Sequence, residues 1–281
     1  MRRRPAGVLA AVAAFWLAAA CLDITSTLPA IASITPVILP FPSVVVGDSS
    51  RDTAGGFAPL RLIAFGRDGK PLDPSDVIVK FYAVDSTQQL FVDSLTGMAF
   101  GKALSPNSGV FAQVRQANGV GGFIQTNVVS FPVVPKPDSA VRSADTTFAF
   151  NGTVSAPDTL NAGLLSQPLA VTLHGVADTL VQKYVIKYEI IERPPTREGG
   201  SGFSVVLTGN GADSTVAVTN SSGLASLRLR VRPQAIPQDV QAGQKTDTVK
   251  VLVTVLYLGA KLKVSPTDTF TIPIIGTVPA S

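Results

Sequence analysis

Residues 218–231 read VTNSSGLASLRLRV, and they decide the fold because a turn leads directly into an alternating strand. Asparagine, serine and glycine form the turn, and the run LRLRVR follows at residues 227–232. Apolar and charged side chains alternate in this run. We therefore expect Leu227, Leu229 and Val231 on a buried face and three arginines on the opposite face, as in a half-buried β-strand.

The rest of the chain repeats this pattern. Short runs rich in Val, Ile, Leu, Phe and Thr are separated by Gly, Pro, Asn and Asp, which favour turns. Residues 249–255, VKVLVTV, predict another strand with the valines on one face. Beyond the first 20 residues no stretch has a sustained 3.6-residue apolar period, so the sequence predicts an all-β protein.

An internal repeat divides this all-β body into two copies. Four blocks recur in the same order: PLRLIAFG and PLAVTLHG (59–66, 168–175), VIVKFYAV and VIKYEII (77–84, 185–191), FVDSLTGMA and VAVTNSSGLA (91–99, 216–225), SFPVV and TIPII (130–134, 271–275). The alignment places Phe81 over Tyr188 and Gly97 over Gly223. It predicts a first domain at 44–134, a linker at 135–145 and a second domain at 146–281.

The turn motifs resemble those of bacterial immunoglobulin-like modules of the invasin/intimin type. That family has a D-x-x-G-x-P turn before a strand ending in V-x-F, and later a T-[DN]-x-x-G-x-A turn. Residues 66–81 and 92–99 carry both in the first copy, and residues 218–231 carry the second motif in the second copy. The resemblance implies two tandem immunoglobulin-like β-sandwiches that act as rigid spacers or adhesive modules. The second copy departs from the family by an insertion at 193–213 and by a first turn without glycine.

The beginning of the chain predicts export. Three arginines precede an apolar run of 15 residues, from Ala6 to Ala20, which is shorter than the roughly 20 residues of a membrane-spanning helix. Residues 17–21, LAAAC, resemble a bacterial lipobox and end on Cys21, the only cysteine. The resemblance implies cleavage after residue 20 and acylation of Cys21. Ordinary signal peptidase cleavage and a retained anchor helix are the alternatives.

Residues 21–43 are expected to be the lipidated N-terminus and a tether, because they contain four prolines and no charge after Asp23. Leu22 stands where some Gram-negative lipoproteins carry an aspartate that retains them at the inner membrane. If that family rule applies, the outer membrane is favoured. The expected location is the bacterial cell envelope, with the membrane as a partner through the N-terminal lipid.

Charge and composition exclude some functions. Without the three leader arginines, 20 basic residues oppose 19 acidic ones, a net charge of 20 − 19 = +1. This balance argues against a nucleic-acid partner, which needs a strong basic excess. A single histidine, His174, and a single cysteine argue against a zinc site, since zinc normally takes three or four Cys, His or carboxylate ligands. We expect no cofactor, no metal and no catalysis.

Candidate contact residues remain. The row Arg228, Arg230 and Arg232 could contact an acidic glycan or lipid headgroups, but the near-neutral charge favours a solvated strand face that guards against edge pairing. His174 aligns with Phe65, which indicates packing at a strand end rather than catalysis. Residues 209–213, GNGAD, have a faint similarity to calcium-binding nonapeptide repeats, but a single copy is weak evidence because such sites are built from stacked repeats.

The insertion at 193–213 is the remaining candidate, with Phe203 as its only aromatic residue. Loops at sandwich ends carry specificity in such domains, and a simple extra hairpin is the other interpretation. We therefore expect a non-catalytic cell-envelope lipoprotein, a structural or adhesive immunoglobulin-like module with an envelope protein or glycan as partner. The alternative is a carbohydrate-binding accessory protein that uses this insertion.

Overall fold

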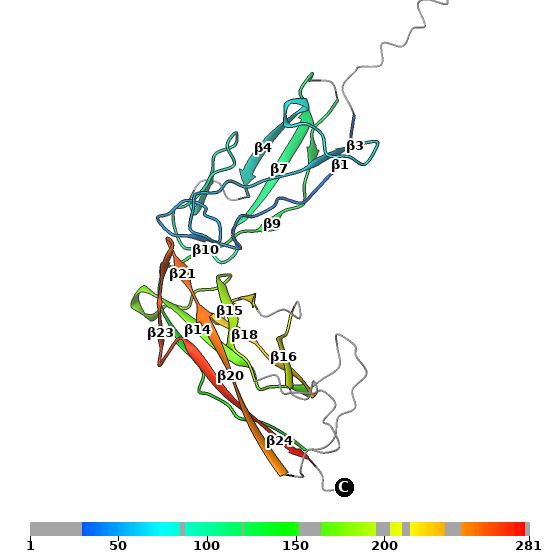
Figure 1. The fold of residues 1–281 in the computed structure, drawn as a ribbon. Coiled ribbons are helices and arrows are strands. Elements are labelled where there is room, and N and C mark those ends of the chain that lie inside the picture. The colour runs from blue at the N-terminus through cyan, green and yellow to red at the C-terminus, as the bar shows by residue number, and fades with distance from the viewer. Residues whose placement is uncertain are drawn as a thin grey trace, which may run out of the picture.

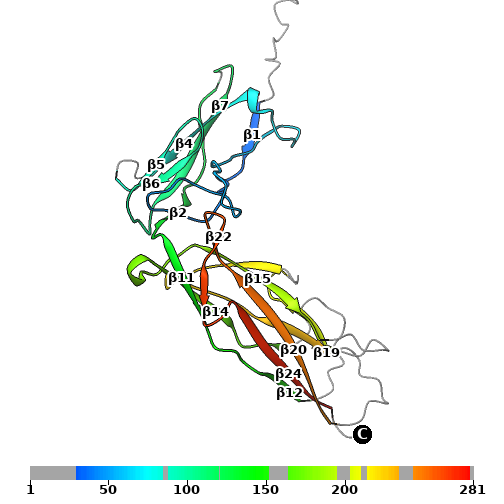
Figure 2. The same ribbon diagram turned by 60° about the vertical axis from the view of Figure 1, so that its left-hand side comes forward.

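The computed structural model describes residues 30–84, 88–119, 121–151, 164–194, 203–209, 214–233 and 243–278. These residues form two all-β domains that are joined end to end (Figures 1 and 2). The N-terminal strand lies at the end of the first domain that is remote from the second, and the last strand ends at Val278 at the far end of the second domain (Figure 1). None of the described segments is a helix long and apolar enough to cross a membrane.

The first domain is built from ten short strands and one 3₁₀ helix. They are β1 (Ile31–Ile34), β2 (Val44–Val45), β3 (Ala64–Gly66), η1 (Pro74–Asp76), β4 (Val77–Ala83), β5 (Leu90–Val92), β6 (Ala99–Gly101), β7 (Gly109–Gln116), β8 (Ile124–Gln125), β9 (Val129–Ser130) and β10 (Val133–Val134).

Strand β7 is central to the first domain, since it pairs antiparallel with β4 on one side and with β8 and β9 on the other. Along β7, Val110 and Ala112 face inward and are fully buried, because successive side chains of a strand point to opposite faces. They pack with Phe81, Leu90 and Phe131 in one apolar cluster. The intervening residues of β4 and β7 form an outward face.

The described residues of the second domain form fourteen strands and one 3₁₀ helix. They are β11 (Pro137–Arg142), β12 (Phe148–Asn151), β13 (Leu164–Leu165), β14 (Leu169–Gly175), η2 (Val176–Asp178), β15 (Val185–Glu192), β16 (Phe203–Leu207), β17 (Ser214–Val218), β18 (Leu224–Leu227), β19 (Leu229–Pro233), β20 (Gly243–Thr254), β21 (Leu256–Tyr257), β22 (Ala260–Lys261), β23 (Lys263–Ser265) and β24 (Thr269–Val278).

These strands form the two main sheets of an immunoglobulin-like sandwich. One sheet has the order β18-β14-β11-β23, and the other has the order β12-β24-β20-β15-β17. The first strands divide between them: β11 pairs antiparallel with β14, whereas β12 pairs parallel with the last strand, β24. A third sheet, β13-β19-β16, extends the structure. Two packed sheets, mainly antiparallel and with the first strands shared between them, are typical of this fold.

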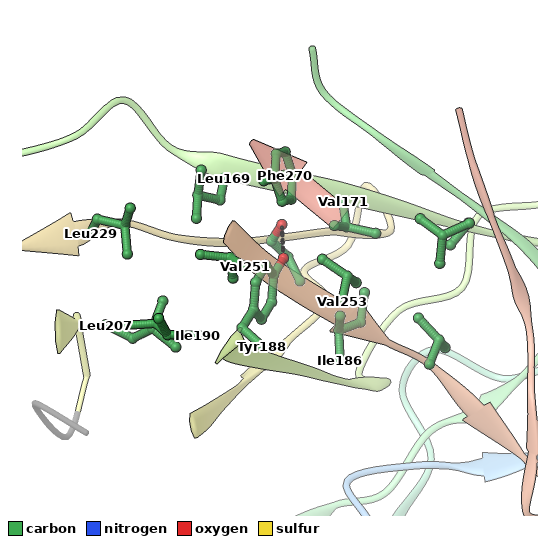
Figure 3. Packing of buried hydrophobic residues seen from close by; sticks show 14 of the residues in the cluster. Leu169, Val171, Ile186, Tyr188, Ile190, Leu207, Leu229, Val251, Val253 and Phe270 are labelled. Atoms are coloured by element: carbon green, nitrogen blue, oxygen red, sulfur yellow. Dashed lines mark hydrogen bonds between the residues drawn. The ribbon is translucent and has the colours of Figure 1, made fainter. Parts of the chain in front are cut away.

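Tyr188 on β15 lies at the centre of the second core and is fully buried (Figure 3). Its hydroxyl donates a hydrogen bond of 3.3 Å to the carbonyl of Ala225 on β18, in the facing sheet. Around it pack Leu169, Val251 and Phe270, also fully buried (Figure 3). A buried hydroxyl needs such a partner, because an unpaired polar group in the core destabilises the fold.

The turns that suggested the repeat adopt matching conformations. Gly97 and Gly223 both have positive φ angles, 74° and 66°. Before each, a side-chain oxygen caps the turn: Asp93 Oδ1 accepts from the amides of Leu95 and Thr96, and Asn220 Oδ1 accepts from two amides of its own turn. The equivalence of the two copies therefore extends to backbone geometry.

Two expected boundaries are wrong. Strand β1 begins at Ile31, inside the expected tether, and it pairs with β3, so the first domain starts well before residue 44. The expected linker at 135–145 contains β11, which pairs with β14 and β23 of the second domain. Only Pro135 and Lys136 separate β10 from β11. Proline and polar content suggested a tether and a linker, but pairing with strands from other parts of the chain determines the structure at these positions.

The sequence predicted that the run LRLRVR forms one continuous strand, but in the structure it is divided between two strands. Strand β18 ends at Leu227 and pairs with β14, whereas β19 starts at Leu229 and pairs with β16 and β13. The chain changes sheet at Arg228. Leu229 and Val231 are fully buried as the alternation predicts, and Leu227 is half-buried against the same core. The valines of β20 also share one buried face, as predicted.

Candidate functional site

The strongest structural feature outside the two cores is the junction between the domains. Strands β2 and β10 pair in parallel there, with Val44 opposite Val133 and Val45 opposite Val134. Val44 and Val133 belong to the first core, whereas Val45 and Val134 belong to the second. Because neighbouring residues of a strand face opposite sides, one short ladder contributes to both cores. The domains therefore share buried structure and are not connected by a flexible linker alone.

Polar and aromatic contacts reinforce this ladder. Ser43, which is almost fully buried, donates a hydrogen bond of 2.9 Å to the carbonyl of Lys183. The ring of Phe41 meets the ring of Tyr184 edge to face, with centroids 4.8 Å apart. The Tyr184 hydroxyl donates to the carbonyl of Leu256 at 2.7 Å. These contacts fix the orientation of the domains, since hydrogen bonds and edge-to-face rings are both directional.

A turn of the first domain also packs closely against the β21–β22 hairpin of the second. A side chain on Gly55 would place its Cβ 2.6 Å from the amide nitrogen of Gly259, so only glycine fits. Arg51 supports the Gly55 turn: its guanidinium donates to the Gly55 carbonyl and forms an ion pair with Asp48 at 2.8 Å. Figures 1 and 2 show the hairpin reaching the first domain.

The junction leaves little free space. A cavity of about 40 Å³ lies between Tyr184 and Tyr257 of the second domain and Arg51 and Asp48 of the first. Such a volume holds a few water molecules rather than an organic ligand. Burial raises the pKa of Tyr257, and the nearby Asp48 carboxylate adds to this shift while Arg51 opposes it. Burial likewise raises the pKa of Tyr184. Both phenols are therefore protonated at neutral pH.

The arginines expected in one row are dispersed at a sheet change. Arg228 is exposed in the break between β18 and β19, and Arg230 on β19 is half-buried opposite Val206 of β16. Arg232 lies opposite Ser204 in the same register. The side chains of Arg232 and Phe203 lie outside the described part of the structure, as does Cys21. The contact role of these residues remains a prediction.

The insertion at 193–213 contributes a strand to the fold. Strand β16 comes from it and pairs with β19, and its Val205 and Leu207 are fully buried. Its backbone also accepts a hydrogen bond of 3.0 Å from Arg193 to the Val205 carbonyl. This part of the insertion therefore fills the core, and it does so as a strand paired with β19 outside the insertion rather than as a separate hairpin. Residues 195–202 and 210–213, including most of GNGAD, lie outside the described segments.

His174 sits at the end of β14, the position that the repeat assigns to it, and Phe65 occupies the same place on β3. Each pairs with the chain returning from the next turn, His174 with Leu180 and Phe65 with Pro71. His174 Nδ1 lies 2.5 Å from Asp178 Oδ1. Ser139 stands opposite His174 in the register, but no hydrogen bond joins the two side chains in the described structure, so no nucleophile–base pair is formed. The described residues also contain no cluster of three or more metal-ligating side chains.

No family model matches this chain, and no curated protein matches it either. Similar solved structures include the adhesin InvE of Yersinia pseudotuberculosis, with 14% identity, a TM-score of 0.32 and coverage of 86% of this chain and 58% of that one. Fibronectin(III)-like modules of Clostridium thermocellum CbhA show 12% identity and a TM-score of 0.29, covering 88% and 95%. The CupB6 tip adhesin of Pseudomonas aeruginosa shows 10% identity and a TM-score of 0.28, covering 88% and 98%.

This chain thus spans a little over half of the Yersinia adhesin chain. Each likeness has a TM-score below 0.5 and is too distant to support a function. The fold assignment rests on the strand pairing described above.

Proposed function

We propose that the protein is a non-catalytic, lipid-anchored spacer of the bacterial cell envelope that holds its second domain away from the membrane. The observation that carries this proposal is the junction, where one parallel ladder contributes valines to both cores. A rigid connection of this kind is what a spacer needs. A flexible linker would let the distal domain fall back toward the surface.

The direction of the spacer follows from the two ends of the chain. Cys21 is nine residues before Ala30, where the described structure begins, so a lipidated Cys21 would lie within about 30 Å of the first domain. The first domain lies between that end and the second domain (Figure 1). With an anchor at Cys21, the first domain is proximal to the membrane and the second domain is distal.

The anchor is tested by Cys21→Ala. We expect the unmodified protein in the detergent phase of a phase separation and the variant in the aqueous phase. Ser33→Ala, an exposed substitution in β1, is the control and is expected to stay with the detergent. Partition of the Cys21→Ala variant into detergent would contradict lipidation.

The rigid junction is tested by spin labels at Lys70→Cys and Ser226→Cys, both exposed, in the Cys21→Ala background. Pulsed electron resonance is expected to give one narrow distance distribution. Val134→Ser places a hydroxyl in the second core at the junction and is expected to broaden the distribution, whereas Val216→Ser on the exposed face of β17 leaves it narrow. A broad distribution in the parent protein would refute the spacer.

A further inference from the structure

The outward face of the first domain's main sheet carries an unusual set of side chains. On β4 the outward residues include Lys80 and Tyr82, and on β7 they include Phe111, Gln113 and Arg115, since the residues between them face the core. All five are half-buried, so their outer surfaces remain open to solvent. The described strands β4, β7, β8 and β9 contain no aspartate or glutamate.

The strand register arranges these side chains in rows. Tyr82 stands opposite Phe111, and their rings stack with centroids 5.3 Å apart. In the next row Lys80 stands opposite Gln113, whose amide nitrogen donates at 3.2 Å to the side-chain oxygen of Gln125 on β8. The face thus presents aromatic surface, a pair of amides and a cation next to one another (β4 and β7 in Figures 1 and 2).

A second cation lies in the third row. The Arg115 guanidinium lies 5.2 Å from the ring centroid of Phe123, which is 52% exposed. The Nε of Arg115 has no hydrogen-bond partner, and no ion pair to Arg115 or Lys80 occurs among the described residues. Both cations are therefore uncompensated, whereas Arg51 is neutralised by Asp48 and Arg142 by Asp145.

We propose that this sheet face binds an acidic polysaccharide, a chain of uronic-acid sugars. Apolar faces of sugar rings pack on aromatic side chains, glutamine amides can donate to and accept from hydroxyl groups, and the two cations pair with carboxylates. Three rows along β4 extend over about 14 Å, so the face suits several successive units of an extended polymer. The positive charge of the face is complementary to the negative charge of that polymer.

Other partners fit this face less well. A peptide that adds a strand binds along a sheet edge, whereas this face is centred on β7, whose backbone groups are already paired with strands on both sides. A nucleic acid would need more cations along its phosphates. A membrane surface favours a continuous apolar face, but the middle row of this face holds Lys80 and Gln113 between the aromatic row and Arg115.

The test uses the purified mature chain and polygalacturonate in affinity electrophoresis, with neutral dextran as comparison. We expect retardation by polygalacturonate only. The double variant Lys80→Gln/Arg115→Gln is expected to weaken binding about tenfold, because it removes both charge-assisted contacts. The matched control is Lys261→Gln/Lys263→Gln, which removes the same charge from exposed positions of the second domain and is expected to bind normally.

Tyr82→Leu tests the stacking surface, because it keeps an apolar side chain but removes the ring. We expect binding to fall about tenfold while the urea midpoint, measured alongside, shows that the domain remains folded. Several results would overturn the proposal: no retardation of the native chain, equal retardation by dextran, or equal loss of binding in the Lys261→Gln/Lys263→Gln control. Equal binding of polyglutamate, single-stranded DNA or anionic lipid vesicles would replace it with another partner class.

Discussion

The two domains place an aromatic residue at the same position of the same strand, Phe81 in the first and Tyr188 in the second, but they surround it differently. The Tyr188 hydroxyl reaches across its core to the carbonyl of Ala225 in the facing sheet. In the first domain Gly97 closes over the ring of Phe81, and a Cβ on Gly97 would lie 3.1 Å from two of its ring carbons. A core of this fold accepts a polar atom only where the opposite sheet supplies its partner.

Removing either ring is expected to have the largest effect. Tyr188→Ala and Phe81→Ala should each lower the free energy of unfolding by about 4 kcal/mol, because each leaves a large cavity in a packed core. Urea denaturation followed by circular dichroism measures both changes. Val216→Ala, at a side chain that is 54% exposed, is the control and should change stability by less than about 0.5 kcal/mol. A loss below about 1 kcal/mol for either ring would show that it is not central to its core.

The turn glycines give a smaller, matched comparison. Gly97→Ala and Gly223→Ala should each cost about 2 kcal/mol or more, because a Cβ would lie 2.9 Å from the carbonyl oxygen of Leu60 or Leu173 in a left-handed conformation. Gly69→Ala separates the two causes, since Gly69 has a φ of 75° but open space around its Cβ. It should cost only about 1 kcal/mol by urea denaturation. Equal losses in the free energy of unfolding for Gly69→Ala and Gly97→Ala would show that steric contact at Gly97 contributes nothing.

The buried Tyr188 also makes the free energy of unfolding depend on pH in alkaline solution. Burial raises the pKa of Tyr188 above its ordinary value, so the folded state keeps the phenol protonated while the unfolded chain ionises near pH 10. The protonated phenol of Tyr188 therefore makes its full contribution to the free energy of unfolding below about pH 10. Above that pH the contribution falls by on the order of 1 kcal/mol per pH unit.

Urea denaturation from neutral pH to about pH 11 measures this slope, and Tyr188→Phe should reduce it. Phe81→Leu in the first domain is the control and should leave the slope unchanged. An identical slope in Tyr188→Phe and the native protein would mean that other groups cause the alkaline loss.

The sequence predicts the all-β class and the turns well, because both depend on local signals. Alternation placed Leu229 and Val231 in the core, and the alignment of Gly97 with Gly223 identified two residues with the same backbone conformation. These signals are confined to a few neighbouring residues, so they do not depend on how distant parts of the chain pair.

The domain boundaries and the outward face of the first domain could not be predicted from local sequence signals. Residues 137–142 contain a proline, an aspartate and an arginine and look like a linker, yet they pair with two strands from distant parts of the chain. Val44 and Val45 form a uniform apolar pair, and nothing local shows that they enter different cores. The outward face with Tyr82, Phe111 and Gln125 is assembled only by the strand register. Each of these features depends on non-local pairing.

The parallel pairs also determine how the protein responds to tension. In each domain an early strand lies parallel to the last strand, β2 beside β10 and β12 beside β24. When a force pulls the chain from its two ends, such neighbours must slide past each other, so their hydrogen bonds are loaded together in shear and do not break one at a time. We expect single-molecule stretching to show two abrupt ruptures at high force. Gradual extension at low force would contradict this mechanical design.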